Sequence, residues 1–163
     1  MILFCVYSIL FIYLIYFIWI TEPLFEKKKV NKKAYYPFVS IIVSAKNEEH
    51  NIEKLLNSLS KQNYPEEKYE IIIANDQSVD QTLKKLLYFE SLVSNLKIIN
   101  IEKTPINWGS KKWAINNCIN NSNGEIILQT DADCIHGKDW IFEMAQPFQN
   151  YDIGFVCGPS YIG

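Results

Sequence analysis

Residues 38–62 read FVSIIVSAKNEEHNIEKLLNSLSKQ, and this stretch decides the fold. Its first part, 38–44, is rich in β-branched residues, which favour an extended strand. The later part, 48–62, carries apolar residues every three or four positions, as a helix with one apolar face does. These are Ile52, Leu55, Leu56 and Leu59. The stretch therefore predicts a strand followed by an amphipathic helix.

The alternation of strand and helix continues towards the C-terminus. By the same patterns we expect strands at 69–74, 96–101 and 125–129, and helices at 80–93, 111–121 and 139–148. Strands that alternate with helices form a mainly parallel sheet with helices on both faces, so the expected fold class is α/β. In such sheets ligands bind beyond the carboxyl ends of the strands, where we therefore look for a site.

Composition narrows the class of protein further. A length of 163 residues allows about one domain. With 48% hydrophobic and 21% charged residues, the chain resembles an ordinary globular protein, and its net charge of -2 argues against general binding to nucleic acid. The four cysteines contain no Cys-x-x-Cys pair, so we expect them to be free, reduced and mostly buried. They are Cys5, Cys118, Cys134 and Cys157.

The first residues have the composition of a membrane anchor. Residues 1–20 are apolar or aromatic except for Ser8, and a helix of that length spans about 30 Å, the thickness of a bilayer core. A cleaved signal peptide is less favoured, because bulky residues stand at 17–20 where small ones would precede the cut. Residues 21–37 form a basic linker, and lysine-rich flanks of a membrane helix stay on the cytoplasmic side. We therefore expect a single-pass transmembrane helix at 1–20, with 38–163 facing the cytoplasm. Its lysines are Lys27, Lys28, Lys29, Lys32 and Lys33.

Polar residues follow the first two predicted strands. The first strand ends in Ser44, followed closely by Asn47, which is explained equally by a helix cap. The second ends in the run Asn75 to Ser78, where Asp76 is placed to accept hydrogen bonds from a base or ribose. An ordinary turn uses the same residue types, and Ser78 with Gln81 resembles a capping box. These two strand ends are therefore candidates that need support from elsewhere.

A sharper signal follows the fourth strand, which runs directly into Asp131-Ala132-Asp133. Two carboxylates after a buried strand are costly unless they are solvated or paired with a cation. Oxygen ligands with open positions suit Mg²⁺ or Mn²⁺ shared with substrate phosphates. The strand end therefore predicts a metal and phosphate site.

Four motifs in order carry a resemblance to a known family. They are 39–44 (VSIIVS) with 47–49 (NEE), 75–82 (NDQSVDQT), 111–116 (KKWAIN), and 124–127 (GEII) leading to 131–134 (DADC). Together they make 38–163 resemble the first part of a family 2 glycosyltransferase, the inverting GT-A-fold enzymes that use nucleotide-diphosphate sugars. The resemblance implies a truncated GT-A domain whose partner is a nucleotide-diphosphate sugar, with UDP-sugars favoured. The sequence does not identify the acceptor, and the membrane anchor with its cytoplasmic orientation is compatible with a lipid or a polysaccharide.

The resemblance also implies roles for individual residues. Ser44 would border the nucleotide base, and Asp76 would accept a hydrogen bond from it. Asp131 would contact the ribose or diphosphate, and Asp133 would ligate the Mg²⁺ or Mn²⁺ cofactor. Lys111 would lie near the diphosphate, although a lysine at the start of a helix is equally ordinary.

The chain departs from the family pattern at several positions. Asn75 stands where an aspartate is frequent, and Ser110 where a glycine precedes the lysine. The resembled domain continues past Gly163, and the family's general base lies in that later part, so the catalytic residue is unassigned and this piece alone is expected to be inactive. The later carboxylates of this chain are Asp139, Glu143 and Asp152, and none is assigned as the base.

Other classes of protein fit the sequence less well. The turn after the first strand has no glycine, which excludes the Gly-x-Gly-x-x-Gly turn of a dinucleotide enzyme, and no P-loop run is present. A nucleotidyltransferase would need a glycine-rich, basic first loop. Cys134 and His136 lack the second ligand pair of a zinc site and predict a buried thiol and a surface imidazole. The open alternative is a membrane-anchored protein that binds a nucleotide sugar, or acts as a scaffold, without turnover.

Overall fold

The structure is a computed structural model that describes residues 2–25 and 34–158. It divides into two compact units, Met1–Asn31 and Lys32–Gly163. Each unit is described by itself below. The five lysines of the predicted linker lie outside the described residues.

The first unit contains helix α1, Ile2–Phe25. This helix passes the expected boundary at residue 20, and the Thr21 hydroxyl donates to the carbonyl oxygens of Phe17 and Ile18. Its described apolar side chains are exposed, among them Leu10, Leu14 and Ile18. Among the described residues, none of the helices meets the length and apolarity required to cross a membrane. The transmembrane helix is therefore not confirmed.

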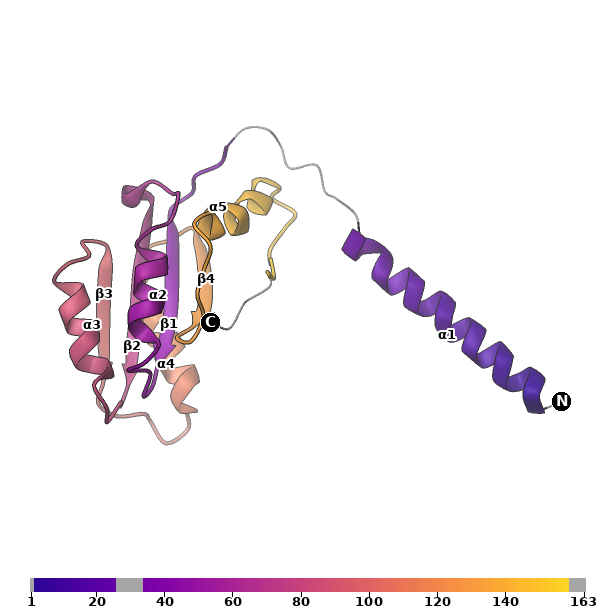
Figure 1. The fold of residues 1–163 in the computed structure, drawn as a ribbon, viewed down its shortest axis with the longest axis horizontal. Coiled ribbons are helices and arrows are strands. Elements are labelled where there is room, and N and C mark those ends of the chain that lie inside the picture. The colour runs from indigo at the N-terminus through magenta and orange to yellow at the C-terminus, as the bar shows by residue number, and fades with distance from the viewer. Residues whose placement is uncertain (1, 26–33, 159–163) are drawn as a thin grey trace. The chain divides into compact units, whose positions relative to one another are not determined.

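The second unit is built on a four-stranded parallel sheet in the order β3-β2-β1-β4 (Figure 1). The strands are β1 Val39–Ala45, β2 Tyr69–Asp76, β3 Leu96–Ile101 and β4 Ile126–Asp131. In the register, Ser44 lies opposite Asp131, and Ala45 lies opposite Asn75. The carboxyl ends of β1, β2 and β4 therefore meet at one edge of the sheet, as the alternation of strands and helices predicts.

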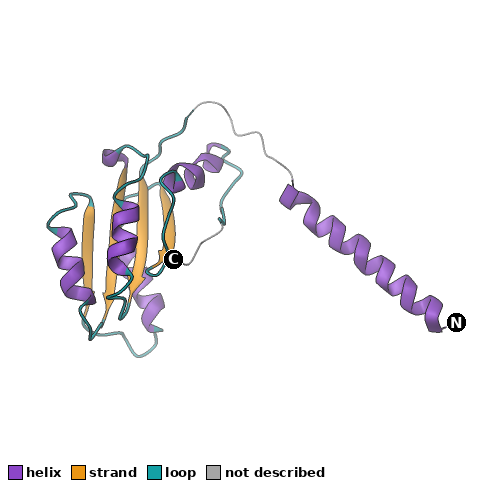
Figure 2. Cartoon of the chain, viewed as in Figure 1, coloured by secondary structure: helices purple, strands orange, loops and turns teal. Residues whose placement is uncertain are grey.

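Helices cover both faces of this sheet (Figure 2). The α-helices are α2 Ile52–Leu59, α3 Thr82–Glu90, α4 Ser110–Asn120 and α5 Trp140–Ala145, with short 3₁₀ turns η1 Glu66–Lys68 and η2 Gln146–Gln149. Helices α2, α3 and α5 contribute to one core cluster, and α4 contributes to the other. The expected mainly parallel α/β architecture is confirmed.

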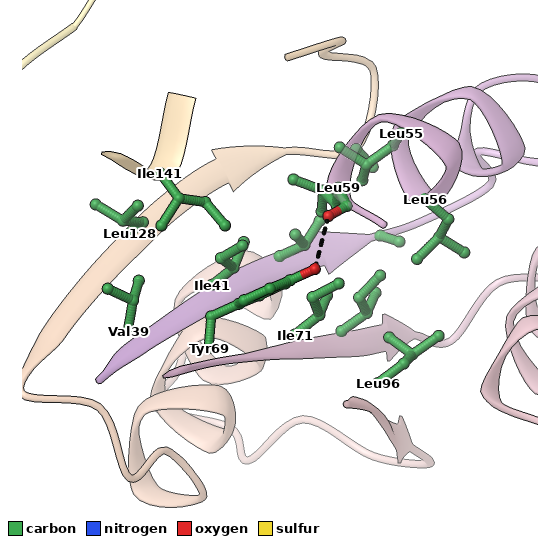
Figure 3. Close-up of a cluster of buried hydrophobic side chains, with 14 of the residues drawn as sticks. Val39, Ile41, Leu55, Leu56, Leu59, Tyr69, Ile71, Leu96, Leu128 and Ile141 are labelled. Carbon is green, nitrogen blue, oxygen red and sulfur yellow. Dashed lines mark hydrogen bonds between the residues drawn. The ribbon is translucent and has the colours of Figure 1, made fainter. Parts of the chain in front are cut away.

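Successive side chains of the central strands point alternately into two hydrophobic cores, one on each face of the sheet. Ile41 and Ile71 face α2, whose Leu55, Leu56 and Leu59 are buried against them (Figure 3). On the other face a smaller cluster packs against α4. It contains Ile42, Ile72, Ala74, Ile101, Ala114 and Cys118. Because both faces are covered, the central strands are apolar runs rather than alternating ones.

Several predicted element boundaries change in the structure. Helix α2 begins at Ile52 rather than at residue 48, and the backbone N–H groups of Glu48 and Glu49 donate to the side chains of Thr82 and Asp80. Helix α3 spans 82–90 rather than 80–93, and Leu87 within it is 51% exposed. Leu87 follows the fully buried Leu86, and successive helical residues point about 100° apart.

The described cysteines agree with the expected free state. Cys118, Cys134 and Cys157 are all free, and the first two are buried while Cys157 is exposed. The Cys118 thiol contacts the carbonyl oxygens of Val43 and Ile72, and burial raises its pKa to about 11. A thiol of this kind is a core residue rather than a nucleophile.

The amino-terminal edge of the sheet is closed by a polar network of Ser40, Glu70, Asn123 and Gly124. The buried Ser40 hydroxyl donates to Glu70 Oε1 at 2.6 Å and accepts from the Gly124 N–H at 2.8 Å. The Asn123 N–H also donates to Glu70 Oε1, at 2.6 Å. We call these four residues the amino-terminal network. It holds the connection from α4 to β4 against the start of β1.

Candidate functional site

The carboxyl ends of the strands enclose a cavity of about 340 Å³. All five site residues proposed from the sequence line this cavity, and they come from three strands or the turns after them and from the start of α4. The lining residues are Ser44, Lys46, Glu48, Asp76, Ser110, Lys111, Asp131, Ala132 and Asp133. Residues separated by almost 90 positions are thus brought to one rim. We call this cavity the carboxyl-edge pocket.

Asp76 ends β2 at the base of this pocket and is only 2% exposed. The Ser110 hydroxyl lies 2.6 Å from Asp76 Oδ1 and also hydrogen-bonds to Oδ2. Gln77 Nε2 donates to Oδ1 at 3.2 Å, and Lys46 Nζ lies 3.7 Å from Oδ2. A buried carboxylate requires such partners, because burying an unpaired charge is costly. These contacts hold Asp76 in one orientation.

Asp131 ends β4 on the opposite side of β1 from Asp76. Its Oδ1 accepts a hydrogen bond from Lys111 Nζ at 2.8 Å, and both side chains are more than half exposed. An exposed ion pair of this kind contributes little to stability. Lys111 is therefore free to exchange Asp131 for another anion without a large energetic penalty.

The Asp-x-Asp turn orients its two carboxylates outward. Ala132 and Cys134 are buried, whereas Asp131 and Asp133, which alternate with them in the sequence, are exposed. Within the described ranges, no group of three or more His, Cys, Asp or Glu side chains is placed to hold a metal ion. Two solvated carboxylates beside a pocket nevertheless fit the donor set of Mg²⁺, which commonly takes one or two carboxylates together with substrate phosphates.

Two loops above the pocket are braced against each other. Asn47 has a left-handed backbone, with φ of 56°, and its Oδ1 accepts from the Val79 N–H at 2.9 Å. In return, the Asn47 N–H donates to Ser78 Oγ at 3.0 Å. The interpretation of Asn47 as a helix cap is therefore wrong, since Asn51 takes the N-cap position of α2. The capping box of Ser78 and Gln81 is also wrong, because Ser78 is used between the loops.

Asp80 adds a further link between these loops. It accepts from the N–H groups of Thr82, at 2.9 Å, and Glu49, at 3.2 Å. Burial alone would raise the pKa of Asp80, but hydrogen bonds from Thr82 and Glu49 outweigh it and lower the pKa. The charged form is stabilised, so the two loops are joined by a charge-assisted contact.

His136 lies beyond the Asp-x-Asp turn and is half-buried, so the expectation of a surface imidazole holds only in part. Its Nε2 lies 2.8 Å from Thr130 Oγ1, and its ring stacks on Trp140 with centroids 3.9 Å apart. Burial lowers the pKa of His136. A larger cavity of about 700 Å³ lies along β4, and it is lined by this histidine, by Trp140 and by residues 154–158.

Lys46 and Ser110 are site residues that sequence reasoning did not assign. Lys46 lies in the turn after β1, and its position beside a strand end was the available signal. Ser110 was noted only as a departure from a family pattern. Its contact with Asp76 depends on how α4 crosses the sheet, which no local pattern encodes.

A family comparison accounts for this combination of fold and pocket. Residues 40–163 match the model of "Glycosyl transferase family 2". The chain belongs to glycosyl transferase family 2. This family domain covers all four strands except Val39, the first residue of β1, and it includes every residue of the carboxyl-edge pocket.

Known relatives and structures agree with this assignment. The chain is 36% identical over 120 residues to a beta-monoglucosyldiacylglycerol synthase of Nostoc, covering 74% of this chain and 25% of the relative. The fold matches Staphylococcus aureus TarS 1-349 in complex with UDP, with a TM-score of 0.60 and 27% identity, over 74% of this chain and 38% of that one.

A second solved structure matches the chain with a higher TM-score than TarS does. It is the mannosyltransferase PcManGT from Pyrobaculum calidifontis in complex with GDP-Man and Mn²⁺, with a TM-score of 0.67 and 25% identity, over 81% of this chain and 39% of that one. The matched part of the chain spans only 25% to 39% of the length of the first curated relatives. The assignment therefore concerns the part of the family domain that contains the carboxyl-edge pocket.

Proposed function

We propose that this family 2 domain binds a nucleotide-diphosphate sugar, with a UDP-sugar favoured, as the donor-binding part of a longer enzyme. That enzyme would transfer the sugar with inversion to a lipid or polysaccharide acceptor. The observation that carries the proposal is the meeting of Asp76, Asp131 and Asp133 with Lys111 at one pocket. An aspartate at the floor of the pocket can accept a hydrogen bond from a nucleoside. A lysine and a pair of carboxylates at the rim suit a diphosphate with its counter-ion.

In this proposal each pocket residue has a distinct task. Ser44 borders the base, Asp76 accepts a hydrogen bond from it, and Asp131 contacts the ribose or diphosphate. Lys111 exchanges Asp131 for a phosphate oxygen. TarS in complex with UDP and PcManGT in complex with GDP-Man and Mn²⁺ support a nucleotide ligand for this fold.

We further propose that Asp133, together with Asp131, holds a Mg²⁺ or Mn²⁺ ion. When bound there, the ion supplies positive charge that stabilises the departing diphosphate. The residues of this chain bind and orient the donor. No general base is assigned among the described residues, since Asp139, Glu143 and Asp152 all lie outside the lining of the carboxyl-edge pocket.

We also propose that α1 attaches the protein to a membrane as a single-pass anchor, with the domain on the cytoplasmic side. The support is the apolar run 1–20 followed by five lysines, which would contact anionic headgroups. Membranes from cells that express the chain should retain it through alkaline carbonate extraction. Release into the supernatant would contradict the anchor without touching the proposal for the pocket.

Calorimetry tests the proposed donor site. The whole chain in detergent should bind UDP and a UDP-sugar with Mn²⁺ present, and removal of the metal should weaken that binding strongly. Asp133→Ala should abolish the metal dependence, because it removes a metal ligand. The matched control is Asp152→Ala, an exposed carboxylate outside the pocket, which should bind as the wild type does.

Two results would count against the proposal in different ways. Equal binding with and without metal, or none at all, would contradict the donor site. Metal-dependent binding with no sugar transfer by the longer protein, measured as UDP release with candidate acceptors, would favour the alternative of a nucleotide-sugar-binding scaffold.

A further inference from the structure

Ser110 occupies an unusual place in the carboxyl-edge pocket. It is the first residue of α4, yet its hydroxyl hydrogen-bonds to Asp76 at the end of β2. The hydroxyl oxygen lies within hydrogen-bond distance of both oxygens of the carboxylate. An atom close to both oxygens lies between them, in front of the carboxylate.

That position is the one a two-pronged ligand would need. A partner that donates two parallel hydrogen bonds to a carboxylate approaches between its oxygens, as an arginine fork does. With Ser110 in place, a ligand can approach Asp76 only from the side of a single oxygen.

The remaining capacity of Asp76 can be counted. A carboxylate has about four lone-pair positions. The single Ser110 proton uses one, Gln77 Nε2 at 3.2 Å from Oδ1 uses a second, and Lys46 Nζ at 3.7 Å from Oδ2 faces a third. One position remains for a ligand that enters the carboxyl-edge pocket.

Among nucleobases, this count separates uracil from guanine. The Watson–Crick edge of uracil offers one N–H donor, at N3, between two acceptors. Guanine offers two adjacent donors, at N1 and N2, which pair with both oxygens of a carboxylate only from the front position that Ser110 occupies. We propose that Ser110 is a specificity-determining residue that restricts Asp76 to a base with one donor, and so favours uridine over guanosine nucleotides.

This inference rests on the proposed function and deepens it, since it concerns which base the same pocket accepts. The test is calorimetric titration of the whole chain in detergent with UDP and with GDP, each with Mn²⁺. The wild type should prefer UDP. Ser110→Ala clears the front of the carboxylate, so the preference for UDP over GDP should fall by about tenfold.

Three further variants make the result specific. Ser110→Gly should act as Ser110→Ala does, and it serves if the alanine variant folds poorly by circular dichroism. Ser110→Thr keeps the hydroxyl and should keep the preference. Ser122→Ala, beyond the other end of α4, removes a hydroxyl that bonds the Ile119 carbonyl oxygen at 2.7 Å and should change nothing.

The outcomes separate this inference from the function on which it rests. If the wild type binds neither nucleotide, both are wrong. If it binds UDP but Ser110→Ala and Ser110→Gly keep the full preference, the role of Ser110 is wrong and the nucleotide site stands. A wild type that binds GDP as tightly as UDP would overturn the inference and the UDP preference in the proposed function, while the nucleotide site itself would stand.

Discussion

The two edges of the sheet both carry polar side chains, but they use them differently. At the amino-terminal network, Ser40 and Glu70 are bonded to the backbone of the α4–β4 connection, and their hydrogen-bonding groups are directed at protein. At the carboxyl-edge pocket, Asp131 and Asp133 are exposed beside an open cavity. Polar residues at one edge serve the fold, and those at the other are available to a ligand.

This contrast teaches why strand ends of one parallel sheet differ in function. The connection from α4 returns to β4 at the amino-terminal edge and fills it with backbone groups that must be paired. At the carboxyl edge the strands turn outward into loops that brace each other, which leaves space between them. Substitutions at the two edges should therefore separate stability from binding.

The largest effect on stability is expected from Gly124→Ala in the amino-terminal network. A Cβ atom at this position would lie 2.6 Å from Ser40 Oγ and also meet the backbone of β1. Because the backbone cannot move aside easily, we expect a loss of about 3 kcal/mol in the free energy of unfolding. Denaturation of the chain in detergent, followed by circular dichroism, measures it.

Gly137→Ala is the matched control, since a Cβ atom there meets nothing within 4 Å. It should change stability by less than about 0.5 kcal/mol. The folded fraction of the Gly124→Ala variant should still bind UDP as the wild type does. A variant that folds normally but loses UDP binding would break the contrast between the edges.

The opposite pattern is expected for Lys111→Ala in the carboxyl-edge pocket. The ion pair with Asp131 is exposed, so its loss should change stability by less than about 0.5 kcal/mol. If Lys111 reaches the diphosphate, losing that charge should weaken UDP binding by about tenfold and leave uridine binding unchanged.

Lys112→Ala provides the comparison for this variant, because Lys112 is an exposed neighbour outside the pocket. It should bind UDP normally. Equal affinities for UDP in both variants would show that Lys111 is an ordinary lysine at the start of a helix.

The smallest effect is a pH dependence of stability that arises from His136. Burial lowers the pKa of His136 in the folded protein, so the unfolded chain binds the proton more readily. The contribution should be complete above the unfolded pKa of about 6.5 and should decline as the pH falls towards the lower folded value. We expect this change to be smaller than the effects of the Gly124 and Lys111 substitutions.

Thermal unfolding between pH 7.5 and pH 5.5 follows this change. His136→Gln should flatten the profile in that range, whereas His50→Gln, at an exposed position, should leave it as in the wild type. An unchanged profile in His136→Gln would mean that another group causes the acid sensitivity.

Much of this arrangement follows from local sequence patterns. The strand 96–101 was predicted with its observed bounds, and the position of Asp76, Asp131 and Asp133 after apolar strands predicts that they meet at one edge. These features depend on periodicity and on the rule that parallel strands end together. Both are properties of the local sequence and the fold class.

Other features depend on contacts between distant residues and could not be predicted. Asn47 resembles a cap in isolation, but its partner is the loop at Val79. The same holds for Ser110, which pairs with Asp76 only because α4 crosses the sheet at that end. His136 was placed at the surface because its partners, Thr130 and Trp140, carry no signal of their own.

Nuclear magnetic resonance mapping of UDP binding tests the central claim most directly. With Mg²⁺ present, UDP should shift the backbone amide signals of Lys46, Gln77, Lys111 and Asp133 at the carboxyl-edge pocket. The signals of Ser40, Glu70 and Asn123 should stay unchanged. Shifts confined to that amino-terminal network or to the cavity along β4, with the carboxyl-edge pocket unaffected, would contradict the account.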